Sequence, residues 1–263
     1  MPFVSQYRGA SRSVLVILAA VLAMLALVAL VWAVVPQAAP APSVTAAPSA
    51  EPVPIALVIG DSQAHGGQGV TTATAWVAQG LLRAGYDPEV QGHGGTGYLK
   101  GRPRNGDGER LSYLQSLQHD AYSLPPAQNV GLVVVQGGGN DASYPDRGIE
   151  AAASDVVRIL KSKYPHARFA IVGPLNQGGD PGSRRVEVTE VLAGVADGQD
   201  AAFIDATDWV ADNDLAEHLH KDGLHLNQDG HDRLAAVFTT ALDDAGLAAP
   251  RWTTWPRVET RPT

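Results

Sequence analysis

Cysteine is absent from the 263-residue chain. This absence excludes disulfides, a thiol nucleophile, thiolate zinc sites, iron–sulfur ligation and a lipoprotein anchor. It leaves the cellular compartment open, because exported proteins need not contain disulfides. The compartment must therefore be inferred from the topology of the chain.

Basic residues are scarce, with 19 lysines and arginines against 27 aspartates and glutamates. Arg8 and Arg12 are the only charged residues before Glu51, so the rest of the chain is more acidic than the overall net charge of −8. An acidic body repels the phosphate backbone, and we expect no nucleic-acid partner.

Several catalytic signatures are also missing. The chain has no Gly-x-Ser-x-Gly elbow, no Ser-x-x-Lys pair, no Gly-Lys-Ser or Gly-Lys-Thr phosphate loop and no His-Glu-x-x-His. These absences exclude the corresponding hydrolase, nucleotide-binding and zinc-protease designs. The composition, with 45% apolar residues, is that of a globular protein.

A long apolar run does occur near the N-terminus. From Val14 to Val35 there are 22 consecutive apolar residues, enough as a helix to cross a bilayer. Because Arg8 and Arg12 precede this run, we expect a single transmembrane helix over 14–35 with residues 1–13 in the cytoplasm. Secretion after signal-peptide cleavage is the alternative.

Composition divides the remainder into three parts. Residues 36–54 contain six prolines and six alanines and predict an extended linker. We expect one catalytic domain over 55–248 and a C-terminal tail over 249–263.

The domain alternates short apolar runs with helical patterns. The expected strands are 55–59, 86–91, 131–135, 169–172 and 201–204, and the expected helices are 71–84, 107–120, 147–163, 183–197 and 228–245. Such alternation predicts an α/β fold in which helices cover both faces of a parallel sheet.

Polar motifs follow these strands. They are Gly60-Asp61-Ser62, Gly94-Gly95-Thr96-Gly97, Gly138-Gly139-Asn140-Asp141 and, before the last helix, Asp222-Gly223-Leu224-His225. In an open parallel sheet, ligands bind outside the carboxyl ends of the strands. We therefore expect all four motifs to share one rim.

Three of these residues have the chemistry of a nucleophile and its activating groups. A serine hydroxyl needs a base, and the base works best when a carboxylate orients it. Ser62, His225 and Asp222 supply these types, and a spacing of three residues lets Asp222 and His225 face one way. Glycine N–H groups at 94, 95 and 97 and the Asn140 amide are candidate donors to an oxyanion.

The motifs together resemble the SGNH subgroup of the GDSL esterase and lipase family, here a membrane-anchored bacterial member. The resemblance implies a flavodoxin-like three-layer sandwich around a five-stranded parallel sheet. It also implies a Ser62, Asp222 and His225 triad with an oxyanion hole formed by Ser62, Gly95 and Asn140, for which Gly94 and Gly97 are alternatives to Gly95.

Ser62 is followed by Gln63, where many relatives have leucine. We do not expect this difference to affect the chemistry.

Other polar residues have simpler explanations. His65 is a rival base that we expect to be an ordinary rim residue, and His93 is expected to be a solvated loop histidine. His218 and His220 beside Glu217 suggest a metal, but without further ligands we predict no metal site. Asp141 is expected to tie down a loop.

The expected function is that of a serine esterase acting on O-acyl groups of envelope glycans or lipids, without a cofactor. The alternatives are an O-acyltransferase with the same acyl-enzyme and a non-catalytic envelope-binding module. The expected partners are an acyl-ester substrate of the cell envelope and the membrane. The expected location is the cell membrane with an extracytoplasmic catalytic domain.

Overall fold

The computed structural model describes residues 16–28, 53–105, 108–180 and 182–250. The chain divides into two units, Met1–Ala50 and Glu51–Thr263. In the first unit residues 16–28 are helical. Within the described residues, no helix is both long enough and apolar enough to cross a membrane.

The expected membrane span of 14–35 is therefore not supported by the structure, because the helix that is described covers only part of it. Outside the described residues lie the remaining parts of the expected N-terminal segment, span, linker and tail, namely residues 1–15, 29–52 and 251–263.

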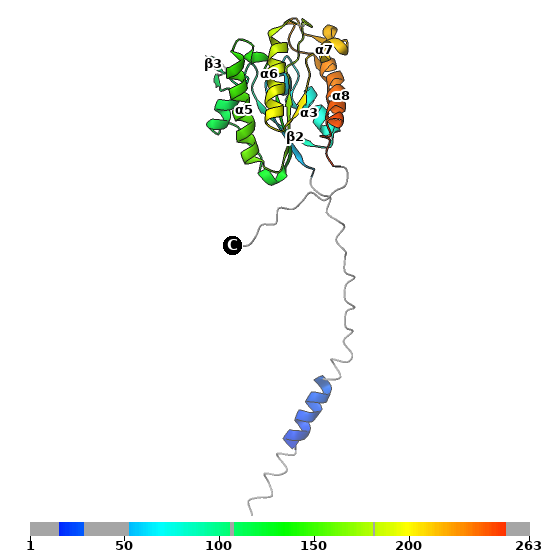
Figure 1. Ribbon diagram of the computed structural model, residues 1–263. Coiled ribbons are helices and arrows are strands. Elements are labelled where there is room, and N and C mark those ends of the chain that lie inside the picture. The colour runs from blue at the N-terminus through cyan, green and yellow to red at the C-terminus, as the bar shows by residue number, and fades with distance from the viewer. Residues whose placement is uncertain (1–15, 29–52, 106–107, 181, 251–263) are drawn as a thin grey trace, which may run out of the picture. The chain divides into compact units, whose positions relative to one another are not determined.

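A five-stranded sheet forms the centre of the second unit (Figure 1). Its strands are β1 (Ile55–Gly60), β2 (Asp87–Gly92), β5 (Val130–Gln136), β6 (Arg168–Val172) and β7 (Ala202–Ile204). They lie in the order β2-β1-β5-β6-β7, and every neighbouring pair is parallel. All five strand predictions are confirmed, and the order is that of flavodoxin-like sheets.

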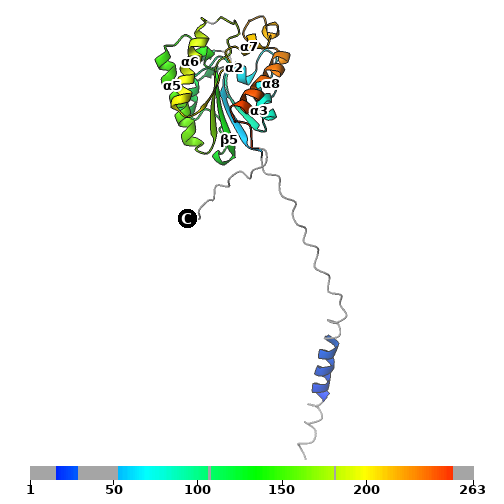
Figure 2. The ribbon, with the colours of Figure 1, turned by 45° about the vertical axis from the view of Figure 1, so that its right-hand side comes forward.

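Helices cover both faces of the sheet, so the unit has three layers (Figure 2). The helices are α2 (Ser62–His65), α3 (Trp76–Arg83), α4 (Tyr113–Gln118), α5 (Asp146–Lys163), α6 (Arg184–Gly198), α7 (Trp209–Asp212) and α8 (Gln228–Asp244). Short 3₁₀ turns occupy Thr72–Thr74, Ala127–Asn129, Gly139–Asp141 and Ala216–His218. The predicted α/β sandwich is confirmed.

The alternation of side chains along β1 explains why the sheet is covered on both faces. Leu57 and Ile59 pack into the core that α4, α5 and α6 cover, whereas Ala56 and Val58 pack into the core beneath α3 and α8. All four are fully buried, which is why the strand has no polar side.

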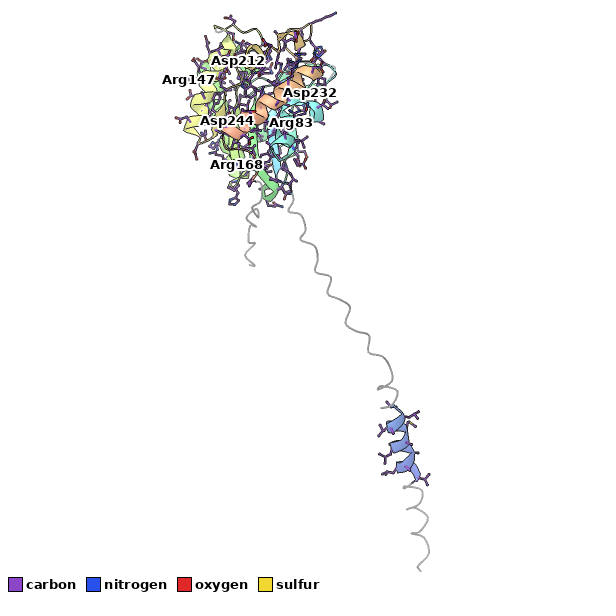
Figure 3. The ribbon with its side chains drawn as sticks, turned by 90° about the vertical axis from the view of Figure 1, so that its right-hand side faces the viewer. Arg83, Arg147, Arg168, Asp212, Asp232 and Asp244 are labelled. Atoms are coloured by element: carbon purple, nitrogen blue, oxygen red, sulfur yellow. The ribbon has the colours of Figure 1, made fainter. Side chains whose placement is uncertain are left out.

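The pair α3 and α8 packs closely, with the charged side chains Asp232 and Asp244 on the outer face of α8 (Figure 3). A Cβ atom at Gly80 would lie 2.6 Å from the Phe238 ring, so only glycine allows this approach. The Trp76 ring meets Phe238 edge-on with 5.0 Å between centroids. This contact fixes α8, which begins just after the Asp222 to His225 turn.

One helix prediction is wrong at its start. Residues 108–110 of the predicted helix 107–120 form β4 (Gly108–Arg110), which pairs antiparallel with β3 (Arg102–Asn105). The helix starts at Tyr113, because Ser112 accepts a hydrogen bond from the Gln115 N–H and caps it.

A buried histidine replaces the missing side-chain cap of α3. Ala75 precedes the helix and has no capping group, and Nδ1 of His231 accepts the Trp76 N–H at 3.0 Å. His231 is 2% exposed, and burial lowers its pKa to about 4. Since Nδ1 is an acceptor here, the folded protein holds this imidazole neutral.

We expect this histidine to make stability depend on pH. In the unfolded chain it takes up a proton near pH 6.5, but in the folded chain only near pH 4, so stability is lost as pH falls through this window. The loss attributable to His231 is about 3 kcal/mol.

Urea unfolding at pH 7 and pH 4 measures the loss. His231→Gln keeps an acceptor that does not titrate, and its free energy of unfolding should fall less between the two pH values. An identical decrease of the free energy of unfolding in both proteins would contradict the assignment of this pH dependence to His231.

Candidate active site

Three neighbouring strands deliver the predicted site residues to one edge of the sheet. Ser62 follows β1, the loop containing Gly95 follows β2, and Asn140 follows β5. These strands are adjacent in the order β2-β1-β5, so their carboxyl ends meet. The turn from Asp222 to His225, before α8, joins them.

Asp222, His225 and Ser62 form a continuous chain of hydrogen bonds. Nε2 of His225 lies 2.9 Å from Oγ of Ser62, and Nδ1 of His225 lies 2.8 Å from Oδ2 of Asp222. These distances are those of ordinary hydrogen bonds. The arrangement matches what a serine nucleophile, its base and an orienting carboxylate require.

The turn that carries His225 is organised by Asp222 itself. Oδ1 of Asp222 accepts the backbone N–H groups of Leu224 at 2.9 Å and His225 at 3.0 Å. The bonds from the His225 ring and from these two N–H groups hold the pKa of Asp222 well below its usual range. Asp222 is therefore a carboxylate at neutral pH, with one oxygen for the backbone and one for the ring.

The turn at Ser62 is equally defined. Asp61 precedes α2, and its side chain accepts the Gln63 N–H at 2.8 Å. A Cβ atom at Gly60 would lie 2.5 Å from Cβ of Ala64, so the sharp turn from β1 into α2 requires glycine. Ser62 is the first residue of the helix, and its N–H has no intrahelical acceptor.

The glycine loop after β2 lies against the serine. A Cβ atom at Gly94 would be 3.4 Å from Cβ of Ser62. Among the described residues, the N–H groups of Gly94 and Gly95 have no hydrogen-bond partner, whereas that of Gly97 donates to the Lys100 carbonyl at 2.8 Å. Gly94, which lies against Ser62, and its neighbour Gly95 thus keep a free donor, and Gly97 does not.

The Asn140 amide is close to the serine turn but is already bonded. Its Nδ2 donates to the Thr96 carbonyl at 2.9 Å and to Oδ2 of Asp61 at 3.2 Å. Both hydrogens of the amide are therefore used. Donation to a substrate oxygen requires exchange of the longer bond, the one to Asp61.

Asp141 ties down the loop that follows the glycines, as predicted. Its carboxylate accepts the backbone N–H groups of Tyr98 at 2.8 Å, Leu99 at 2.9 Å and Lys100 at 2.8 Å. A Cβ atom at Gly97 would lie 2.1 Å from this carboxylate. The block Gly138-Gly139-Asn140-Asp141 therefore orders the neighbouring loop as well as presenting an amide.

Asp61 is a buried carboxylate inside the site. Burial raises its pKa to about 6, while the Gln63 N–H and the charge of Arg185 act in the opposite direction. Arg185 donates to the Leu175 carbonyl at 3.2 Å. The charged guanidinium of Arg185 and the titrating carboxyl of Asp61 thus flank the amide of Asn140.

Sequence reasoning missed the contact made by Gln63. Its Nε2 donates to the Leu224 carbonyl at 2.9 Å and so joins the serine turn to the turn before His225. The side chain is 5% exposed. The only available signal was the Ser-Gln sequence itself, because a contact between residues 161 apart leaves no periodic pattern.

The other histidines have local partners. Nδ1 of His65 contacts Oγ1 of Thr72, and burial lowers the pKa of this imidazole. The His93 carbonyl accepts the Thr96 hydroxyl at 2.7 Å, and its ring is half-buried with a pKa lowered by burial. Neither is bonded to Ser62.

His218 and His220 flank a short antiparallel bridge between Leu219 and Leu226. Nε2 of His218 lies 3.6 Å from Glu217. In the part of the chain that is described, no three histidine or acidic side chains are grouped as metal ligands.

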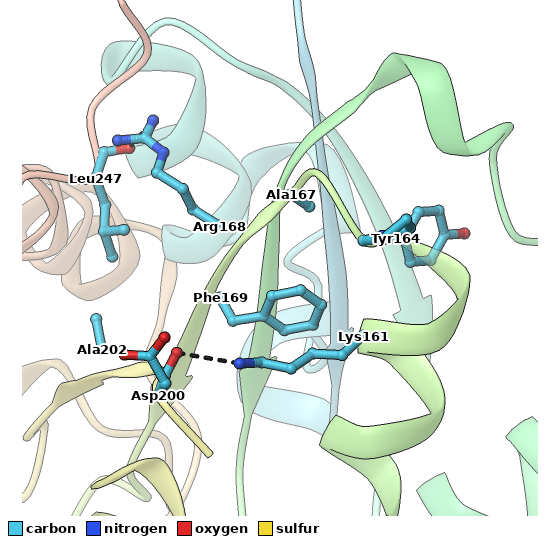
Figure 4. A pocket seen from close by; sticks show the side chains of 9 residues that line it. Lys161, Tyr164, Ala167, Arg168, Phe169, Asp200, Ala202 and Leu247 are labelled. Atoms are coloured by element: carbon cyan, nitrogen blue, oxygen red, sulfur yellow. Dashed lines mark hydrogen bonds between the residues drawn. The ribbon is translucent and has the colours of Figure 1, made fainter. Parts of the chain in front are cut away.

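A hollow of about 560 Å³ lies at the opposite end of the strands, where β6 begins (Figure 4). Its two cations serve local structure, because Lys161 donates to the carbonyls of Gln199 and Asp200, and Arg168 donates to that of Leu247 at 3.0 Å. None of the predicted site residues lines it.

Comparison with known families identifies a match that covers most of the second unit. The model of the GDSL-like Lipase/Acylhydrolase family matches residues 58–233, which include Ser62, Gly95, Asn140, Asp222 and His225. Curated proteins give no match.

Solved structures share the fold. TesA is 20% identical over 73% of this chain and 99% of its own, with a TM-score of 0.54. Est24, a carbohydrate acetylesterase from Sinorhizobium meliloti, is 19% identical over 74% of this chain and 99% of its own, with a TM-score of 0.51. The salicylyl-acyltransferase SsfX3 from a tetracycline biosynthetic pathway is 17% identical over 75% and 57%, with a TM-score of 0.53.

We expect Gln63→Leu to lower the turnover number of any reaction that uses the Ser62 to His225 bond. The substitution removes the donor that holds the Leu224 carbonyl, and a lost hydrogen bond of about 1 kcal/mol corresponds to roughly 5- to 10-fold in rate. KM should change little, because Gln63 is buried beneath the turns. Steady-state kinetics with a chromogenic ester separates the two parameters.

Gln68→Leu is the matched control. Gln68 is exposed, and its bond to Oδ2 of Asp222 is long, at 3.4 Å. Its loss should change the turnover number less than twofold. Full activity of Gln63→Leu would show that the link between the turns is unimportant.

Proposed function

The chain belongs to the GDSL-like lipase/acylhydrolase family, and we propose that it is a serine esterase that hydrolyses carboxylic esters through an acyl-enzyme on Ser62. The observation that carries the proposal is the unbroken hydrogen-bond chain from Asp222 through His225 to Ser62. Unbonded N–H groups beside Ser62 complete the set of groups that acyl transfer needs.

In the proposed first step, Oγ of Ser62 attacks the ester carbonyl while Nε2 of His225 takes its proton. The negative oxygen of the tetrahedral intermediate is held by the N–H groups of Ser62 and Gly95 and by the Asn140 amide. The amide exchanges its bond to Asp61 for one to this oxygen. Each such donor contributes about 100- to 1,000-fold in rate.

Collapse of the intermediate transfers the proton from His225 to the leaving alcohol and leaves the acyl group on Ser62. Water then attacks the acyl-enzyme while His225 takes its proton, the bond between the acyl carbon and Oγ breaks, the acid leaves, and His225 returns the proton to Ser62. Asp222 stays ionised throughout and stabilises the imidazolium. The cycle needs no cofactor or metal.

We further propose that the substrates are O-acyl groups on envelope glycans or lipids, and that residues 14–35 anchor the protein in the membrane. The support is the apolar run preceded by Arg8 and Arg12, which favours export of the domain. Est24, described as a carbohydrate acetylesterase, has the same fold. Release by cleavage after the run is the alternative.

An O-acyltransferase is the second candidate, because SsfX3, described as an acyltransferase, shares the fold. Transfer differs only in that an acceptor hydroxyl replaces water. Product analysis with a sugar acceptor present separates the two, and a majority of acylated acceptor over free acid would overturn the hydrolase assignment.

The proposed nucleophile is tested by labelling the full chain with a fluorophosphonate and locating the adduct by mass spectrometry. We expect the adduct on Ser62 and none in Ser62→Ala, with loss of ester turnover. Asp222→Asn should retain the fold and lower turnover on the order of 10³- to 10⁴-fold, because the ring loses its orienting charge.

Ser143→Ala is a suitable control, since Ser143 is exposed near Asn140 but outside the hydrogen-bond chain. It should label and turn over as the unchanged protein does. An adduct on another serine, or turnover that survives in Ser62→Ala, would refute the proposed mechanism.

A further inference from the structure

Two adjacent arginines at the start of α6 have different surroundings. Arg184 forms ion pairs with Asp146 and with Glu187 and also donates to the Tyr144 carbonyl at 2.9 Å. Arg185 donates to the Leu175 carbonyl, and no ion pair with a described residue is present. The first guanidinium is ion-paired with two carboxylates, and the second forms no ion pair with a described residue.

Arg185 lies directly over the turn that carries Asn140. A Cβ atom at Gly139 would be 2.1 Å from Nη1 of Arg185 and 2.8 Å from its Cζ, so the guanidinium occupies the space that a side chain at 139 would fill. Its charge acts on the buried carboxylate of Asp61, which adjoins Ser62. The cation therefore stands beside the proposed oxyanion site.

Most N–H donors of the Arg185 guanidinium have no acceptor in the described protein. It carries five N–H groups, and the structure assigns one of them to a protein acceptor. Its side chain is partly exposed, and no nitrogen of Arg185 is among the polar atoms of the described residues that are both buried and unbonded. The two nitrogens without a hydrogen bond, Nε and Nη2, are therefore within reach of solvent or of a bound ligand.

The position of Arg185 indicates whether it faces the acyl side or the alcohol side of an ester substrate. The leaving alcohol receives its proton from Nε2 of His225, so it lies on the His225 side of Ser62. His225 precedes α8, whereas Arg185 lies in the first turn of α6, and these helices cover opposite faces of the sheet (Figure 2). In the proposed reaction, the acyl group rather than the leaving alcohol is the part of the substrate on the α6 side.

Resting on the proposed esterase function, we propose that Arg185 binds an anionic group at the far end of the acyl chain. The preferred substrates are then half-esters of dicarboxylic acids, whose free carboxylate pairs with the guanidinium. A planar guanidinium binds a carboxylate through two parallel hydrogen bonds, which fixes the acyl chain as well as its charge.

The test compares nitrophenyl half-esters of four- to six-carbon dicarboxylic acids with neutral nitrophenyl esters of the same carbon number, with enzyme-free rates subtracted. The readout is the ratio of kcat/KM for the anionic ester to that for its neutral match. We expect Arg185→Gln to lower this ratio about 10- to 100-fold, Arg185→Lys to restore part of it, and added salt to reduce it in the unchanged protein.

Arg184→Gln is the matched control, because it removes a neighbouring cation that is already paired, and the ratio should stay within about twofold. Fluorophosphonate labelling of Ser62 reports whether each variant retains a folded site. An unchanged ratio in Arg185→Gln, or an equal loss for charged and neutral esters, overturns the inference while leaving the esterase intact. If the unchanged protein is not labelled at Ser62 and turns over none of the esters, the proposed function is refuted, and the inference that rests on it fails too.

Discussion

The hydrogen bond between Nε2 of His225 and Oγ of Ser62 joins segments that are 163 residues apart, and much of the fold serves to hold its two ends at 2.9 Å. One end is fixed by β1, a strand that is buried from its second residue onward and ends in a turn only glycine can make at position 60. The other is fixed by the docking of α8 on α3. Gln63 spans the gap between them, so the serine and the histidine cannot move independently without breaking this hydrogen bond.

The two aspartates of the site show how burial decides the role of a carboxylate. Asp222 is exposed, and the hydrogen bonds that it accepts keep its pKa low, so it supplies a constant negative charge to His225. Asp61 is buried, and its raised pKa means that its contribution to stability is present in acid and is lost as pH rises through about 6. The charge at Asp61 thus weakens the fold at neutral pH, and it is tolerated at the point where it accepts hydrogen bonds from the Gln63 N–H and the Asn140 amide.

The parts of the fold that the sequence predicted are those with a repeating signal. Val130–Gln136 is apolar almost throughout because a central parallel strand is buried on both faces. The hairpin Arg102–Asn105 with Gly108–Arg110 has no such signal, since its strands are short and polar. The roles of Gln63 and Arg185 depend on contacts with residues distant in sequence, which neither periodicity nor a local motif encodes.

Gly138 and Gly139 show, within one motif, that contacts with residues distant in sequence cannot be predicted from a local pattern. Gly138 has a φ of 101°, a left-handed conformation that favours glycine whatever surrounds it. Gly139 is not in that region; a Cβ atom there would instead lie 2.1 Å from Nη1 of Arg185, whose guanidinium fills the space. The first glycine is therefore a requirement of the turn, and the second leaves room for a cation 46 residues later in the chain. This motif looks like a single signal for an oxyanion site, but its two glycines have different reasons. Gly138 supplies the conformation of the turn. Gly139 leaves space for Arg185, the residue that we propose binds the anionic end of the acyl chain.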